Sequence, residues 1–296
     1  MVAMGHTHHG AEPESLVIGG AGHPAALVTA VRASTVAAAL AARDWVGRGD
    51  KNAADEASVA AMRAVLKTAP FAGTVVIGEG EKDAAPMLAN GERLGTGEGP
   101  EYDIAVDPLD GTRLAADNLP GAVSVIALAP HGAMFNPVDS FYMHKLVSDA
   151  SGLGILSLTL SPTENVRALA AARGVGVAEL VVAVLDKPRH VNLIAELTAA
   201  GIRVLLKPEG DVSTAIAAAT PGSGIDLVMG IGGTPEGIIA ACAVRALGGF
   251  IEGRLAPQSS AERAASIAAG HVLGKVLAAH ELVGSNRVLF ASASVT

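Results

Sequence analysis

The sequence predicts a mixed α/β fold (α+β in its first half), and three observations lead to this expectation. From about residue 161 onward, short apolar runs alternate with glycine-rich or charged loops and with helical segments, as is typical of α/β sheets. Before that point, two helical segments precede separate strand candidates. The chain has 296 residues, of which 50% are hydrophobic, enough to bury a large core in one domain or two.

The region before residue 161 is expected to begin with two helices. Leu27, Val31 and Leu40 recur at helical spacing in the first. Asp50 can cap the second, because its carboxylate accepts amide N–H groups left free at a helix start. Pro70 stops that helix, since proline cannot continue it. The expected elements are helices over 23–46 and about 50–69 and strands at 73–78, 102–107 and 121–129.

Three strand–loop–helix units are expected after residue 161. Their strands are Leu180–Leu185, Ile202–Leu206 and Ile225–Met229. Sites in such sheets form at the carboxyl ends of the strands, where these loops lie. We divide the chain into a tail at 1–20 that contains His6-Thr7-His8-His9 and is expected to be disordered, an α+β region at 21–160 and an α/β region at 161–296.

Composition and charge exclude several classes of function. A net charge of −8 argues against a nucleic-acid partner, because the phosphate backbone needs a basic surface. Cys242 is the only cysteine, so no disulfide forms within the chain, and we expect this side chain in the core. The longest uncharged run, 119–138, contains prolines and glycines, which favours buried strands over a membrane helix. No basic segment followed by an apolar one opens the chain, so we expect a cytoplasmic protein without a membrane partner.

Two acidic turns that follow apolar runs carry the strongest functional signal. Asp107 and Asp110 lie three residues apart after one run, and Glu79 and Glu81 follow another. Strand ends that project carboxylates can hold a hard cation such as Mg²⁺ or Mn²⁺, which prefers oxygen ligands. The candidate ligands are Asp55, Glu79, Glu81, Asp107, Asp110 and Glu236, together with the backbone carbonyl of Leu109.

Features that favour phosphate binding accompany these turns. Gly111 and Thr112 occupy an expected helix start, where free backbone N–H groups favour a phosphate. Residues 230–235 imitate a dinucleotide-binding loop, but Pro235 replaces its third glycine, and a single imperfect match is weak. Four cations that follow predicted strands can grip a phosphate: Lys187, Arg189, His190 and Lys207.

Five segments occur in a recognisable order: 49–55, 76–81, 103–108, 187–190 and 232–237. Together they closely resemble the class II fructose-1,6-bisphosphatases, which belong to the superfamily of lithium-sensitive sugar and inositol phosphatases. The Asp-Pro-Leu-Asp-Gly-Thr motif alone indicates the superfamily, and its combination with the Lys-Pro-Arg-His and Gly-Thr-Pro-Glu-Gly segments indicates class II. The resemblance covers roughly residues 25 to 255 and is weak beyond that point.

The resemblance implies an αβαβα layered sandwich and Mg²⁺- or Mn²⁺-dependent hydrolysis of the 1-phosphate of fructose 1,6-bisphosphate. Thr112 resembles the residue that orients the attacking water, and Lys51 would lie near the metal site, so Thr112, Lys51 and Asp107 are the expected catalytic residues. A homodimer or homotetramer is also implied. Asp55 and Glu79 look like ligands of one metal ion, and Asp107, Asp110 and Glu236 look like ligands around the second and bridging positions.

Other positions match residues that bind the sugar phosphate. In this interpretation the region 21–160 binds the metal ions and the region 161–296 binds the sugar phosphate. The expected substrate-binding residues are Asp110, Gly111, Thr112, Tyr142, Lys187, Arg189, His190, Glu209, Gly210, Asp211 and Gly233.

The chain departs from the class II pattern at three places. Asp110 stands where the family usually has Glu, which is one methylene longer, and Glu209 stands where the family commonly has Asp in an Asp-Gly-Asp segment that contacts the sugar. The residues 140–142 also differ. One alternative is therefore a phosphatase of the same mechanism acting on sedoheptulose 1,7-bisphosphate or another sugar phosphate. An inositol-phosphate phosphatase is disfavoured by the class II segments. A non-catalytic sugar-phosphate sensor is disfavoured because a binder needs no water-activating carboxylates.

Overall fold

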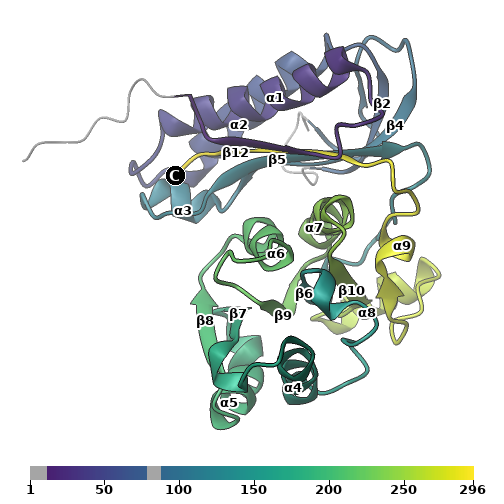
Figure 1. The fold of residues 1–296 in the computed structure, drawn as a ribbon. Helices are drawn as coiled ribbons and strands as arrows, with labels where there is room; N and C mark the ends of the chain where they lie inside the picture. Colours follow the sequence, from purple (N-terminus) through teal and green to yellow (C-terminus); the bar gives the residue numbers. More distant parts are fainter. Residues whose placement is uncertain (1–11, 79–87) are drawn as a thin grey trace, which may run out of the picture.

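Two six-stranded sheets are stacked with helices between and outside them in a computed structural model that describes residues 12–78 and 88–296 (Figure 1). The histidine-containing segment 6–9, Glu79 and Glu81 lie outside the described residues. The first sheet has the order β1-β12-β5-β4-β2-β3, with only β2 and β4 parallel. Its strands are β1 Ser15–Ile18, β2 Ala72–Ile77, β3 Arg93–Leu94, β4 Glu101–Asp110, β5 Val123–Pro130 and β12 Leu289–Ser294.

The second sheet has the order β11-β10-β6-β9-β7-β8. β7 runs parallel to both β8 and β9, and the other neighbours are antiparallel. Parallel strands place their carboxyl ends at one edge of the sheet, where a site can form. Its strands are β6 Tyr142–Ser148, β7 Val181–Leu185, β8 Arg203–Lys207, β9 Leu227–Gly233, β10 Phe250–Leu255 and β11 Leu277–Ala278.

The helices complete five layers. α1 and α2 lie on the outer face of the first sheet, α6 and α7 lie between the sheets, and α4 and α5 lie on the outer face of the second (Figure 1). The expected αβαβα sandwich is confirmed. The helices are α1 Ala25–Arg43, α2 Lys51–Leu66, α3 Thr112–Ala116, α4 Pro162–Arg173, α5 Val191–Ala199, α6 Asp211–Ala219, α7 Thr234–Leu247, α8 Ser260–Ala268 and α9 Ala279–Leu282.

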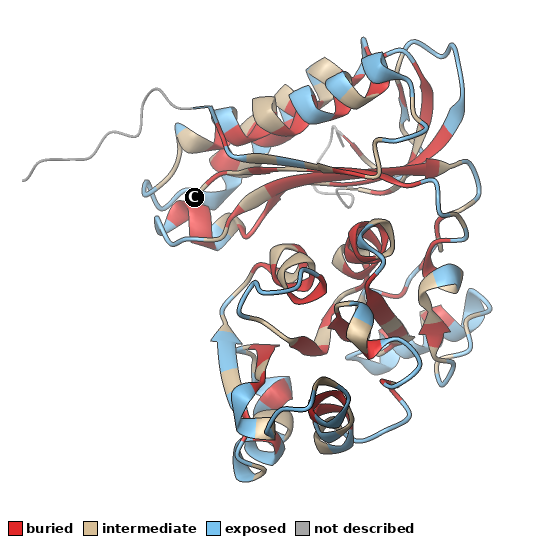
Figure 2. Ribbon diagram, viewed as in Figure 1, coloured by how far each residue is buried: buried red, intermediate tan, exposed pale blue. Residues whose placement is uncertain are grey.

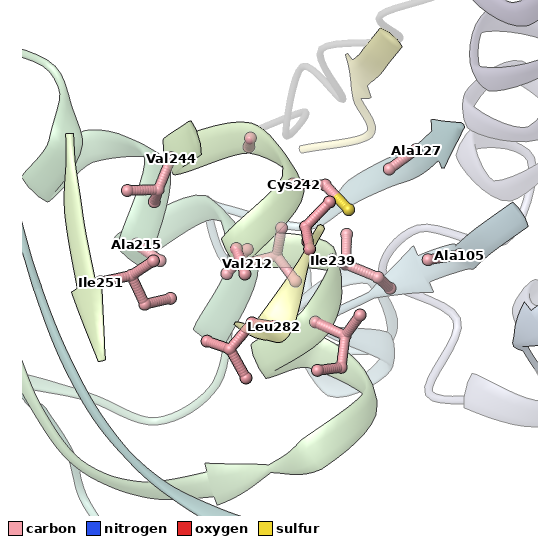
Figure 3. Packing of buried hydrophobic residues seen from close by; sticks show 14 of the residues in the cluster. Ala105, Ala127, Val212, Ala215, Ile239, Cys242, Val244, Ile251 and Leu282 are labelled. Carbon is pink, nitrogen blue, oxygen red and sulfur yellow. The ribbon is translucent and has the colours of Figure 1, made fainter. Parts of the chain in front are cut away.

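The helix α7 is buried over most of its length because it lies between the two sheets. Its many alanines let the sheets approach closely, and Ile239 and Cys242 lie beside Ala105 and Ala127 of the first sheet (Figure 3). Burial raises the pKa of the Cys242 thiol to about 12, so this thiol stays protonated. The expectation that Cys242 is a core residue is confirmed.

Among the described helices, α1 is long and apolar enough to cross a membrane by length and composition. One of its faces, which carries Leu27, Val31 and Ala38, is fully buried. Figure 2 shows this face turned toward the first sheet and the opposite face exposed. This pattern is that of an amphipathic helix covering the core of a folded domain.

The expected helices and strands are confirmed, with boundaries that shift by a few residues. Asp50 caps α2 as expected, because its side chain accepts the N–H of Ala53 at 3.0 Å. The expected strand Ile225–Met229 is too short, since β9 continues to Gly233 and carries its glycines to the edge of the sheet. The prediction missed the strands β1, β3, β6, β10, β11 and β12 and the helices α4, α8 and α9.

The division of the chain at residues 20 and 160 does not follow the two sheets. β1 lies within the segment 1–20 that was expected to be a disordered tail, and it pairs with β12. β6 precedes residue 160 and yet belongs to the second sheet, whereas β12 lies inside the first. Strand pairing between distant segments decides which sheet a strand joins, and a local hydrophobic pattern does not contain that information.

Candidate active site

A cavity of about 420 Å³ lies between elements of both sheets, at the carboxyl end of β4 and at the loops after β7, β8 and β9. It brings together most residues that the sequence singled out, although they are spread over more than half of the chain. The expected site residues in its wall are Asp55, Asp107, Asp110, Gly111, Thr112, Lys187, Arg189, Glu209, Gly210, Asp211, Gly233 and Glu236.

Asp107 and Asp110 reach the same cavity because β4 contains a β-bulge. Asp107 pairs with Val125 of β5, whereas Asp110 pairs with Val123, so β4 has one residue more than its partner between these two pairs. In a regular strand, residues three apart point to opposite faces, and one extra residue brings them to the same face. Pro108 occupies the bulge, where its missing N–H group costs no ladder hydrogen bond.

Gly111 turns the chain from β4 into α3. Its φ of 87° lies in the left-handed region that favours glycine. A Cβ at this position would also come within 3.0 Å of Leu114 Cδ1. Thr112 follows as the first residue of α3 and lines the cavity. The turn therefore places a hydroxyl-bearing residue in the same cavity wall as Asp110.

The described carboxylates make part of the cavity wall acidic. Asp110 is buried, with only 6% of its surface exposed. Burial, followed by the negative charges of Glu236 and Asp211, raises the pKa of Asp110 to about 7. Nearby negative charges disfavour the ionised form of a buried carboxyl group and so raise its pKa. The acidic residues come from four elements or loops: Asp55 of α2, Asp107 and Asp110 of β4, Glu209 and Asp211 after β8, and Glu236 of α7.

The donor chemistry of this wall fits a divalent cation such as Mg²⁺ or Mn²⁺, because both bind carboxylate oxygens. Glu236 lies against Gly233, where a Cβ would overlap Glu236 Oε2, so the glycine leaves space for the carboxylate. Within residues 12–78 and 88–296, no three histidine, cysteine, aspartate or glutamate side chains form a ready metal site. Glu79, an expected ligand, lies outside that part of the chain. The four expected ligands that the structure describes, Asp55, Asp107, Asp110 and Glu236, thus share one cavity without forming a ready metal site.

Lys187 and Arg189 supply positive charge to the same cavity. Arg189 Nε donates a hydrogen bond to the carbonyl oxygen of Ile231 at 2.8 Å, and its guanidinium carbon lies 5.2 Å from the centre of the Tyr142 ring. An aromatic face at this distance attracts the cation. Tyr142 is not part of the cavity wall and acts on the site through Arg189.

His190 is a correction to the expected site. It is 2% exposed and absent from the cavity wall. Its Nδ1 lies 2.7 Å from the carbonyl oxygen of Leu185, and its Nε2 lies 2.7 Å from the N–H of Ile231. Because the N–H can only donate, Nε2 accepts and Nδ1 carries the proton; burial lowers the pKa of His190. The expectation that His190 binds substrate is therefore wrong, since both nitrogens are used to join β7 to β9.

Lys51 is also not part of the cavity wall. It is the first residue of α2 and is exposed. Asp55, one helical turn later, does line the cavity. The expectation that Lys51 takes part in catalysis stays a prediction.

Lys145 of β6 contacts two residues of the cavity wall and was missed by the sequence prediction. It is 2% exposed, and its Nζ forms an ion pair with Asp211 and donates to the carbonyl oxygen of Gly233 at 3.0 Å. A buried lysine is stable only when it is paired in this way. The signal available in the sequence was a lysine within the apolar run 143–147.

Comparisons with known proteins agree with this geometry. The family model described as bacterial fructose-1,6-bisphosphatase, glpX-encoded, matches residues 25–296, so the similarity does not fade after residue 255 as expected. Fructose-1,6-bisphosphatase 1 class 2 of Escherichia coli strain K12 is 42% identical over 275 residues, which cover 88% of this chain and 82% of the relative. Class 2 enzymes of E. coli O6:H1 and Shigella flexneri match equally well. The chain belongs to the glpX-type, class II family of fructose-1,6-bisphosphatases.

Proposed function

We propose that this protein is a phosphoric monoester hydrolase that removes the 1-phosphate of fructose 1,6-bisphosphate in the presence of Mg²⁺ or Mn²⁺. The observation that carries this proposal is a single cavity that contains both the carboxylates of β4 and α7 and the cations that follow β7. In a substrate with two phosphate groups, one phosphate would face the carboxylates and the other would face the cations. The metal dependence of the family agrees with the acidic wall.

The carboxylates of Asp55, Asp107, Asp110 and Glu236, with Glu79, would hold the cations. Divalent cations, when bound, would stabilise negative charge on the phosphate oxygens and lower the pKa of a nearby water molecule. Thr112 would accept a hydrogen bond from the attacking water and orient it, since this residue opens α3 and lines the same cavity as the carboxylates.

Lys187 and Arg189 bind the phosphate that is not cleaved. A guanidinium group makes two parallel hydrogen bonds to phosphate oxygens, and Tyr142 and the carbonyl oxygen of Ile231 hold Arg189 in place for this purpose. Lys145 keeps Asp211 and Gly233 at the cavity wall. We further propose a cytoplasmic enzyme that assembles as a homodimer or homotetramer.

Phosphate release tests the function. The purified protein is assayed with fructose 1,6-bisphosphate, sedoheptulose 1,7-bisphosphate and inositol 1-phosphate, each with Mg²⁺, with Mn²⁺ and with a chelator. We expect metal-dependent release that is fastest from the fructose ester. Faster release from sedoheptulose 1,7-bisphosphate would assign a different sugar to the same mechanism. Tight binding of these esters without any release would favour the sensor.

A further inference from the structure

Two turns of the same shape, one from each sheet, meet at the cavity. Asp110-Gly111 follows β4 and leads into α3, and Glu209-Gly210 follows β8 and leads into α6. Gly111 has φ 87° and ψ 46°, and Gly210 has φ 88° and ψ 54°. Each turn thus consists of an acidic residue, a left-handed glycine and a helix start, although the two are almost a hundred residues apart in the sequence.

The two turns lie side by side. A Cβ built on Gly111 would be 3.0 Å from Leu114 Cδ1, and a Cβ built on Gly210 would be 3.8 Å from the same atom. Both glycines therefore face the side chain of Leu114. Ser213, in the first turn of α6, also directs its hydroxyl group toward the carbonyl oxygen of Gly121, at 3.5 Å. These contacts bring the start of α6 against the α3 segment of the first sheet.

Each acidic side chain caps the helix that begins at the other turn. Asp110 Oδ2 accepts the N–H of Val212 at 3.2 Å, and Glu209 Oε2 accepts the N–H of Arg113 at 3.2 Å. Val212 lies three residues after Glu209, and Arg113 lies three residues after Asp110. The two hydrogen bonds are thus related by an approximate twofold exchange of the turns. Side-chain caps usually act within one helix start, whereas these two act between the sheets.

We infer that Asp110 and Glu209 form a reciprocal clasp that sets the separation between the metal-binding half and the sugar-phosphate-binding half of the cavity. The name clasp denotes these two residues and their hydrogen bonds to Arg113 and Val212. The side chains of Asp110 and Glu209 both bridge the gap between the two turns, so their summed length is a fixed quantity at this contact.

The clasp makes Glu209 a positioning residue for substrate. A bisphosphate that bridges the two halves requires their spacing to match its own length, and this part of the inference rests on the proposed function. Shortening Glu209 removes the hydrogen bond to Arg113, and lengthening Asp110 overfills a buried position. Each single change therefore alters the spacing, while exchanging the two residues restores the summed length.

A double-mutant cycle tests the clasp. The wild type, Asp110→Glu, Glu209→Asp and the double variant are unfolded thermally in a chelator, and their KM for fructose 1,6-bisphosphate is measured with metal present. We expect each single variant to lose about 3 °C in Tm and to raise KM about threefold. The double variant should recover at least half of both losses. Glu98→Asp, which shortens an exposed glutamate, serves as the control and should change neither quantity.

Two outcomes would overturn the inference. Losses that simply add in the double variant would show that the two residues act independently. Recovery of Tm without recovery of KM would show that the contact is structural and does not position substrate. A wild-type protein that releases no phosphate from any ester would contradict the proposed function alone, since the unfolding cycle in chelator still decides whether the clasp exists.

Discussion

The acidic and the cationic parts of the cavity wall are built in opposite ways. Asp110 is buried and held by a backbone N–H group of the other half, whereas Arg189 is exposed and steadied by an aromatic ring and one carbonyl oxygen. The negative charges of Glu236 and Asp211 act on the buried carboxyl group of Asp110 and raise its pKa. The exposed guanidinium keeps its donors free for a phosphate arriving from solution. Under the proposed function, the two ends of the substrate would be bound by metal ions on one side and by side chains on the other.

The largest effect should come from the acidic wall. Asp107→Asn removes a carboxylate charge without changing the size of the side chain, so we expect kcat/KM to fall by about a thousandfold or more. Circular dichroism should show that the variant stays folded. Asp44→Asn, at an exposed position, is the matched control. Full activity in a folded Asp107→Asn protein would remove this residue from the metal site.

A substitution of His190 tests which residues of the segment 187–190 stabilise the fold and which bind substrate. His190→Ala leaves the carbonyl oxygen of Leu185 and the N–H of Ile231 without their buried partner, which should lower the free energy of unfolding by about 2–4 kcal/mol. Urea unfolding measures this loss. His280→Ala, at an exposed position, should leave stability nearly unchanged. A stable His190→Ala protein with impaired substrate binding would restore the original expectation that His190 binds substrate.

Arg189 tests the cationic wall itself. Arg189→Lys keeps the charge but loses the planar fork and the stacking on Tyr142, so we expect KM for the sugar bisphosphate to rise about tenfold. Steady-state kinetics should show a smaller change in kcat. Arg203→Lys on the exposed strand β8 makes the same substitution outside the cavity. An unchanged KM for Arg189→Lys would mean that only its charge is needed.

The repulsion within the acidic wall should appear as a pH dependence of stability. The folded-state pKa of Asp110, about 7, exceeds its ordinary value of 3.8. The stabilisation by the protonated form is therefore complete below pH 3.8 and disappears as pH rises through 7. In a chelator, the free energy of unfolding should fall by about 2 kcal/mol between pH 5 and pH 7. Asp110→Asn should flatten this profile, and an equally steep profile in that variant would assign it to other groups.

Local features of the sequence were sufficient for most elements and for the acidic residues. The cap at Asp50, the stop at Pro70 and the left-handed Gly111 depend on neighbours within a few residues, so their physics is contained in short segments. The motif around Asp107 and Asp110 indicated the superfamily and the acidic chemistry for the same reason, and further short segments indicated class II. Spacing within a motif survives folding unchanged.

Side-chain directions across the cavity depended on contacts between distant segments. Arg189 and His190 are adjacent in the sequence, yet one lines the cavity and the other bonds to Ile231 on β9. Lys145 became a site residue only because β6 pairs with β9 and thereby reaches Asp211. The cap between Glu209 and Arg113 likewise joins two sheets.

What the sequence by itself determined is therefore many of the helices and strands, the family and the acidic chemistry. The tertiary structure decided which charged residues face the cavity, which sheet receives β1, β6 and β12, and how the two halves are held together. The physical reason is that propensity and capping are local free energies. Strand pairing, burial and long-range hydrogen bonds gain their free energy only when distant parts of the chain have met.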